Sequence, residues 1–194
     1  NDIELPKSDL VVLPGGFSYG DYLRCGSMAS KSKIMKSVIN FANGGGMIMG
    51  ICNGFQILVE TGLVPGVLLR NKYLEFICKN VFVRVNNKKN SFFKNINNEI
   101  LEFHIAHNEG NYFCTNDQLK EIEDNEQIAI NYCDRNGNTL EQFNPNGSIK
   151  NIAGIFNKEK NVLGMMPHPE RMIDKSLSGE DGSLFFKNLL QNIK

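Results

Sequence analysis

A cysteine between two glycines is the feature of this sequence with the most obvious chemical potential. Residues 50–54 read Gly-Ile-Cys-Asn-Gly, a G-x-C-x-G pattern that is the cysteine counterpart of the G-x-S-x-G nucleophile elbow. The apolar run before it predicts a buried strand, and the sequence after it predicts a helix that ends near Gly62. A sharp turn between them would expose the sulfur, and the helix N-terminus would favour the thiolate. We therefore predict that Cys52 is a nucleophile; the alternative is a buried cysteine in a glycine-flanked turn.

A cysteine nucleophile needs a base, and His168 is the histidine best placed to serve as one. It lies in Met-Met-Pro-His-Pro-Glu-Arg, residues 165–171. Residues before proline avoid the helical region, so we expect this stretch to be extended. Residues two apart in an extended chain share a face, so Glu170 could hold one ring nitrogen of His168 and leave the other for Cys52. The pattern predicts a Cys-His-Glu triad; the alternative is a surface loop with an isolated histidine.

The glycine-rich loop at residues 14–21 follows an apolar run directly, in the position where α/β proteins bind ligands. Gly15 and Gly16 could present an oxyanion-binding N–H there, beside that of Asn53, although a plain turn is the alternative. The loop lacks the ending of a P-loop, and residues 44–46 do not match a dinucleotide-binding fingerprint. The sequence therefore gives no nucleotide site.

The other two histidines, His104 and His107, stand at the end of a predicted strand. We expect them to be hydrogen-bonded or exposed residues. The alternative is that the loop from His107 to Tyr112 borders the pocket.

The elements around these residues indicate an α/β fold. The first half alternates strand and helix in the rhythm of a doubly wound sheet, and the middle is rich in strands. We predict a mostly parallel, flavodoxin-like sheet flanked by helices, with an antiparallel β excursion, as a single domain over residues 1–194. The expected strands are 9–13, 47–51, 75–85, 99–106, 127–132 and a hairpin of 152–156 with 162–166; the expected helices are 27–42, 53–62 and 182–193, and 86–98 and 116–126 are read as Asn- and Lys-rich connections.

Bulk composition excludes several classes of protein. Lys+Arg and Asp+Glu are equal at 21 each, which gives no nucleic-acid footprint or polybasic membrane surface. No apolar run approaches the ~20 residues of a membrane span and no signal-like start is present, so a soluble cytoplasmic protein is expected. The five cysteines lack a C-x-x-C pair, which argues against a disulfide framework and a metal site. We expect Cys78, Cys114 and Cys133 to be small buried hydrophobic residues.

Five runs of the sequence form a recognisable set: LPGGFSYGDYLR at 13–24, GICNGFQIL at 50–58, IAHNEG at 105–110, NPNGS at 144–148 and GMMPHPER at 164–171. Together they resemble class I, triad-type glutamine amidotransferases, over about residues 11–186. Within that family the sequence is most similar to the branch of glutaminase subunits of phosphoribosylformylglycinamidine synthases, which act in purine biosynthesis. The first and the fourth runs are specific to this branch, whereas the elbow alone indicates only the superfamily.

The resemblance implies an amidotransferase fold and a set of roles. Glutamine would be hydrolysed through a cysteinyl thioester to glutamate and ammonia. The implied roles are Cys52 as nucleophile, His168 as acid and base, Glu170 as its orienter, Gly16 and Asn53 as oxyanion donors, and Gln56 as a residue of the glutamine pocket.

The resemblance also implies partners: an ATP-dependent synthetase subunit that receives the ammonia, and a small accessory subunit. ATP and Mg²⁺ would bind to the synthetase, and no cofactor is expected in this chain. Members of the family normally begin with one further strand and helix before the position of Asn1, and the sequence departs from the pattern at Cys25, His104 and Asn108. Two other functions stay open: the same fold serving a different synthetase, and a non-enzymatic scaffold.

Overall fold

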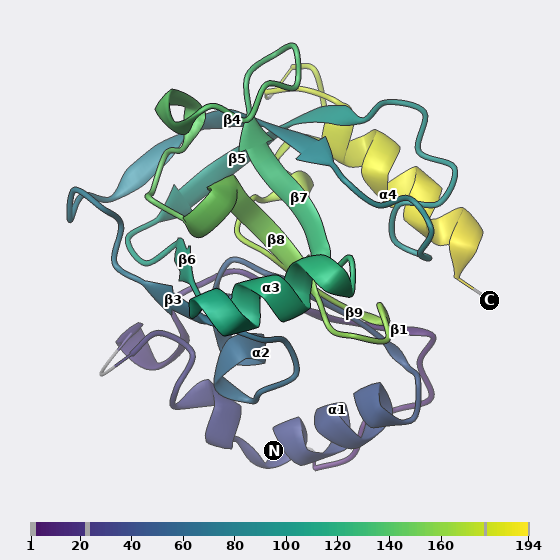
Figure 1. The fold of residues 1–194 in the computed structure, drawn as a ribbon. Coiled ribbons are helices and arrows are strands. Elements are labelled where there is room, and N and C mark those ends of the chain that lie inside the picture. Colours follow the sequence, from purple (N-terminus) through teal and green to yellow (C-terminus); the bar gives the residue numbers. More distant parts are fainter. Residues whose placement is uncertain (1–2, 22–23, 177, 194) are drawn as a thin grey trace.

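The computed structural model describes residues 3–21, 24–176 and 178–193, and a seven-stranded sheet forms its centre (Figure 1). The strand order is β1-β2-β9-β8-β7-β4-β5, and β3 and β6 form a separate small sheet. The strands are β1 (Leu10–Leu13), β2 (Met47–Ile51), β3 (Val67–Leu69), β4 (Ile77–Val85), β5 (Ile100–His107), β6 (Asn111–Phe113), β7 (Ile128–Cys133), β8 (Ile152–Phe156) and β9 (Val162–Met165). The helices are α1 (Lys33–Asn43), α2 (Asn53–Glu60), α3 (Asn116–Asp124) and α4 (Asp181–Asn192).

The sheet is mixed, and the α/β class with an antiparallel excursion is confirmed. The strands β1, β2 and β9 run parallel to one another. From β9 to β5 the described neighbours are antiparallel, so the excursion takes a larger share of the sheet than the sequence suggested. The link from β8 to β9 is only residues 157–161, which permits a hairpin but not a crossover.

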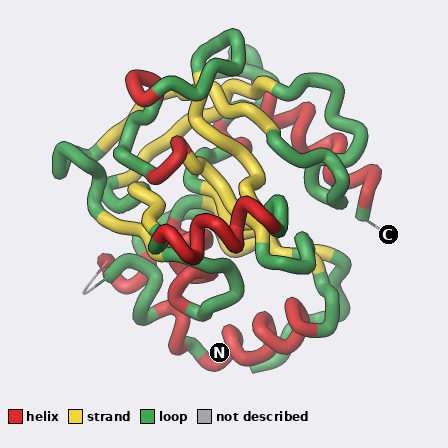
Figure 2. The backbone as a smooth tube through the Cα atoms, in the orientation of Figure 1, coloured by secondary structure: helices red, strands yellow, loops and turns green. Residues whose placement is uncertain are grey.

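Helices cover the sheet through large apolar side chains. The α2 helix packs against the parallel strands, where Phe55 fills the space above Gly164 so closely that a Cβ there would lie 2.1 Å from its ring. At the other end of the sheet, Phe185 of α4 packs edge to face with Phe103 of β5, with ring centroids 6.1 Å apart. In Figures 1 and 2, α1 and α2 lie in the lower part of the molecule and α4 lies to the right, nearer the antiparallel strands.

Two expected elements were wrong. Residues 116–126, read as a connection, contain α3, which begins with a capping box between Thr115 and Gln118. The polar composition masked a helix whose apolar side is only Leu119 and Ile122. The helix expected over 27–42 begins later, at Lys33, after a 3₁₀ turn. Of the signature loop at 13–24, Tyr22 and Leu23 lie outside the described residues.

The parallel strands explain where a site can form. Because β1, β2 and β9 run in the same direction, their carboxyl ends meet at one edge of the sheet. Gly15, Cys52 and His168 follow those three ends within three residues. The fold thus collects at one edge the residues for which the sequence predicted chemistry.

Candidate active site

Cys52 occupies a strained turn between β2 and α2. Its φ of 50° and ψ of −106° lie outside the regions that a side chain normally allows, as in a nucleophile elbow. The flanking glycines are sterically required: a Cβ on Gly54 would lie 2.0 Å from the Leu13 carbonyl oxygen, and one on Gly50 would lie 2.7 Å from the Gly54 backbone. The G-x-C-x-G pattern is therefore explained by close backbone approaches, and the elbow predicted from it is present.

His168 and Glu170 form a direct pair. The ring Nδ1 donates to Glu170 Oε1 at 2.5 Å, and the His168 side chain is 2% exposed. Burial raises the pKa of the Glu170 carboxyl, but the hydrogen bond and charge of His168 outweigh burial and leave this pKa below its ordinary value. The carboxylate is therefore ionised near neutral pH and fixes the proton of His168 on Nδ1.

The backbone that makes this pair differs from the prediction. Residues Pro169–Arg171 form a 3₁₀ turn, so the stretch is not extended after His168. Proline suits the first position of such a turn because it needs no N–H partner there. The turn, with the backbone N–H of His168 bound to the His104 carbonyl at 2.7 Å, sets the ring in place.

Gly15 shows that Cys52 and His168 adjoin. A Cβ on Gly15 would lie 2.6 Å from His168 Cε1 and 3.5 Å from Cys52 Cβ. Both side chains line a cavity of about 230 Å³. Within the described part of the chain, the buried Nε2 of His168 has no hydrogen-bond partner. With Nδ1 protonated, this nitrogen is free to take a proton at the cavity.

Two of the three remaining predicted residues line the same cavity, and the third follows Cys52 directly in the chain. Gly16 and Gln56 line it, and Asn53 is the first residue of α2, where the backbone N–H has no partner within the helix. The side-chain Nδ2 of Asn53 donates to Gln56 Oε1 at 2.8 Å, and Gln56 Nε2 donates to the Glu109 carbonyl at 2.8 Å. These contacts leave the side chain of Gln56 fixed in the wall of the cavity.

The structure adds one wall that sequence reasoning left as an alternative. His107, Asn108 and Glu109 line the cavity, so the loop after β5 borders it. His107 is buried, and its Nδ1 lies 3.1 Å from Asn71 Oδ1. Burial, with the charge of His168, lowers the pKa of His107 to about 4, so its imidazole is neutral near pH 7. His104 is half-buried and hydrogen-bonded to Asn80, so both histidines make the hydrogen bonds expected of them.

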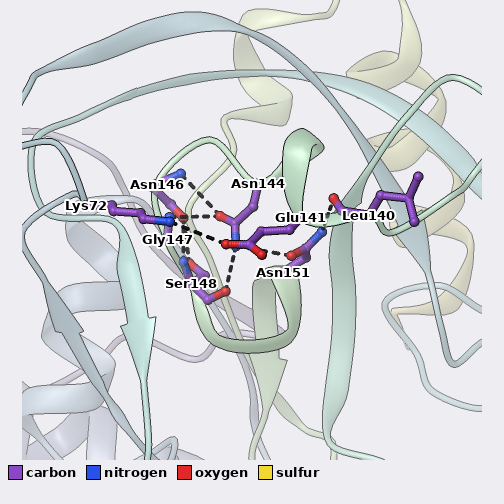
Figure 3. Close-up of polar contacts among 8 residues, drawn as sticks. All are labelled: Lys72, Leu140, Glu141, Asn144, Asn146, Gly147, Ser148 and Asn151. Atoms are coloured by element: carbon purple, nitrogen blue, oxygen red, sulfur yellow. Dashed lines mark hydrogen bonds and ion pairs between the residues drawn. The ribbon is translucent and has the colours of Figure 1, made fainter.

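The NPNGS run of residues 144–148 supports this wall from behind. Figure 3 shows that the run is a turn closed by its own side chains, in which Asn144 accepts from the Gly147 N–H at 2.8 Å. Asn146 and Ser148 then donate to the Gly110 carbonyl at 2.7 and 3.2 Å. The run therefore positions the cavity-bordering loop and does not itself line the cavity.

Comparison with known proteins shows the family of the chain. Residues 1–180 match the model of the CobB/CobQ-like glutamine amidotransferase domain. The chain is 79% identical, over 100% of its length and 86% of the relative, to the phosphoribosylformylglycinamidine synthase subunit PurQ of Pelagibacter ubique. The PurQ subunit of Pseudothermotoga lettingae is 54% identical over 93% of this chain and 76% of its own. The chain belongs to the PurQ family of glutamine amidotransferases.

A solved structure of the same family confirms the fold. A chain of the PurLQS structure from Thermotoga maritima matches with a TM-score of 0.85 and 40% identity, over 98% of this chain and 82% of that one. As a member of the PurQ family the protein is an enzyme, a glutamine amidotransferase. In the ranges that the structure describes, no helix is long and apolar enough to cross a membrane, and no three His, Cys, Asp or Glu side chains could share a metal ion.

Proposed function

We propose that this protein is the glutaminase subunit of a phosphoribosylformylglycinamidine synthase. The observation that carries the proposal is that Cys52 and His168 line one cavity, while Glu170 holds Nδ1 of His168. Among the described residues, His168 Nε2 has no hydrogen-bond partner. The PurQ relatives, which are named as subunits of this synthase, support the choice of pathway.

The reaction begins with the transfer of the Cys52 thiol proton to His168 Nε2. The thiolate attacks the side-chain amide carbon of glutamine and forms a tetrahedral intermediate. His168 returns its proton to the leaving nitrogen, so ammonia departs and a glutamyl thioester remains on Cys52. His168 then takes a proton from water, the resulting hydroxide attacks the thioester, and glutamate and the Cys52 thiol are regenerated.

Two groups of residues would stabilise and recognise the substrate. The backbone N–H groups of Gly16 and Asn53 would hold the oxyanion, a contribution of roughly 3–4 kcal/mol per donor in comparable sites. At the cavity wall, Arg70 and Glu109 lie 3.8 Å apart. They offer charges opposite to those of the carboxylate and ammonium groups of an amino acid. A non-enzymatic scaffold would not need the three triad residues assembled in this way.

The ammonia would pass to an ATP-dependent synthetase subunit, as PurLQS from Thermotoga maritima suggests by its composite name. We further propose that a small accessory subunit takes part and that ATP and Mg²⁺ bind to the synthetase. Residues 1–194 would form one amidotransferase domain, because the seven-stranded sheet takes strands from both halves of the chain.

The test replaces Cys52 with alanine in the complex with the synthetase. We expect glutamine-dependent synthesis and glutamate release to disappear, while synthesis supplied with ammonium salt persists. Cys78→Ala, which removes an exposed cysteine outside the cavity, should retain both activities. Glutamate release by the Cys52→Ala complex would refute the mechanism, and activity with a different synthetase alone would refute the assigned pathway.

A further inference from the structure

Cys78 does not lie where its residue type predicts. Expected to be a buried hydrophobic residue, it is exposed on β4, whereas Cys114 and Cys133 are buried as predicted. Its Sγ lies 3.4 Å from Nε2 of His104, on the neighbouring strand β5. On the other side of the ring, His104 Nδ1 lies 2.9 Å from Asn80 Oδ1. A thiol, an imidazole and a side-chain amide therefore stand in a row, separate from the glutaminase triad.

The hydrogen bonds fix the direction of this row. Asn80 Nδ2 donates to Glu102 Oε1 at 3.3 Å, and a carboxylate only accepts, so the amide oxygen of Asn80 faces His104. His104 Nδ1 must then carry the proton that is donated to Asn80. Its Nε2 presents a lone pair to the Cys78 thiol. The same order of thiol, imidazole and amide activates the nucleophile of papain-like proteases.

The surroundings of His104 keep its ring neutral. Partial burial is the largest cause that lowers its pKa, and the positive charge of Arg171 and the proximity of His168, whose ring would carry the same charge on protonation, lower it further. Glu170 acts in the opposite direction but does not reverse the shift. A neutral imidazole is the form that can accept a proton from the thiol.

We propose that Cys78 is a thiol-modification site, at which His104 acts as base and low-molecular-weight disulfides form a mixed disulfide with the protein. In the step, the Cys78 thiol gives its proton to His104 Nε2, and the sulfur attacks one sulfur of the disulfide. A new S–S bond forms as the old one breaks, and the released thiolate takes the proton from His104. One disulfide is consumed and one is formed, so no further oxidant is needed.

The local structure favours a stable adduct over catalytic turnover. Cys78 lies inside a paired strand, where its Cα is opposite that of Ala106, and not at a helix N-terminus with unpaired N–H groups. It also lines an open cleft of about 1110 Å³ with Lys72 and Lys79. The cleft has room for a small thiol, and Lys79 complements one that carries carboxylates, whereas Lys72 already pairs with Glu141 at 3.3 Å.

An adduct at Cys78 would lie close to the glutaminase cavity. Its strand partner Ala106 lines that cavity, and the Ala106 carbonyl lies 3.7 Å from Cys52 Sγ. We therefore expect the adduct to slow glutamine turnover, an effect that rests on the proposed function.

The experiment treats the full chain with oxidised glutathione and follows adduct formation at each cysteine by peptide mass mapping. Cys78 should react faster than the buried Cys114 and Cys133 in the same sample. His104→Gln should slow the Cys78 reaction about tenfold, less than the usual ~10²-fold of an enzyme base because this pair is exposed. The ratio of the Cys78 reaction rates in wild type and His104→Gln should stay the same at pH 6.5, where an ordinary histidine would be half protonated. Asn80→Ala should slow it to a smaller extent.

Equal rates at Cys78 in wild type and both variants would overturn the proposal, as would a Cys78 rate no greater than that of the buried cysteines. Glutamine turnover is measured separately, before and after treatment. The treated wild type should lose more activity than treated Cys78→Ala, in which modification at Cys52 can still lower turnover. Equal losses would overturn the inference that the Cys78 adduct slows glutamine turnover. If neither protein turns over glutamine before treatment, even in the complex with the synthetase, the proposed function fails while the mass measurement still decides the modification site.

Discussion

Replacing Gly15 with alanine should impair catalysis while leaving the fold in place. The added Cβ would lie 2.6 Å from His168 Cε1 and 3.3 Å from Nδ1. Ordinary contact begins at 3.4 Å, so the ring must move by about 0.8 Å. His168 is buried and tied to Glu170 and to the His104 carbonyl, so this shift changes its position relative to Cys52.

A misplacement of about 1 Å in a catalytic group costs roughly 10²-fold in rate. We therefore expect kcat/KM for glutamate release by the complex to fall about 10²-fold, or about 2.7 kcal/mol. The matched control is Gly44→Ala, where a Cβ meets its nearest atoms at 3.4 and 3.5 Å. It should retain wild-type activity. Ammonia-dependent synthesis and the thermal unfolding temperature of Gly15→Ala should stay near wild type. A kcat/KM within about threefold of wild type, with the fold intact, would show that His168 is not held against Gly15 as described.

Two further predictions concern the wall behind the cavity. Burial and His168 lower the pKa of His107 to about 4 in the folded state. As pH falls below about 6.5, this histidine is protonated in the unfolded chain before it is protonated in the folded one. The free energy of unfolding should therefore fall by up to about 3 kcal/mol between pH 6.5 and 4. Urea unfolding of His107→Gln should lack this loss, and parallel pH curves for the two proteins would contradict the assignment. Asn71 is 1% exposed, donates to the His107 and Glu75 carbonyls, and accepts from the Gly110 N–H. Asn71→Ala should therefore destabilise the protein by about 3 kcal/mol and raise KM for glutamine. As a control, substitution of the exposed Asn98 with alanine should change stability by less than ~0.5 kcal/mol. Equal unfolding temperatures for the Asn71→Ala and Asn98→Ala proteins would refute the role of Asn71.

The parts of the site that sequence predicted are those encoded by neighbouring residues. The elbow at Cys52 depends on a strand, two glycines and a helix within about fifteen residues, and each has a local signature. The His168–Glu170 contact was predicted for the wrong backbone reason. Side chains two positions apart can contact each other in an extended chain. In this protein His168 and Glu170 do so through a 3₁₀ turn that begins at Pro169. Proximity along the chain secured the contact in either case.

Residue type alone misled the prediction at two places. The polar run 116–126 hid α3, because a helix needs only a narrow apolar side when a capping box fixes its start. Cys78 was assigned to the core from the general tendency of cysteine, but its place on β4 is set by the alternation of that strand. Val81, Val83 and Val85 take the buried side, which leaves the part of β4 around Cys78 exposed.

The wall formed by Asn71, Gly110 and residues 144–148 could not be derived from any local pattern. Gly110 gives its N–H to Asn71 and its carbonyl to Asn146, partners that are 39 and 36 residues away. Each of these asparagines, taken by itself, reads as an ordinary turn residue. Only the folded chain shows that they satisfy the two backbone groups of one buried glycine. Because a buried backbone group without a partner costs stability, the amides are constrained as strictly as core residues. A long run such as NPNGS thus has a role that lies one layer behind the chemistry, in holding the loop after His107 against the cavity of Cys52.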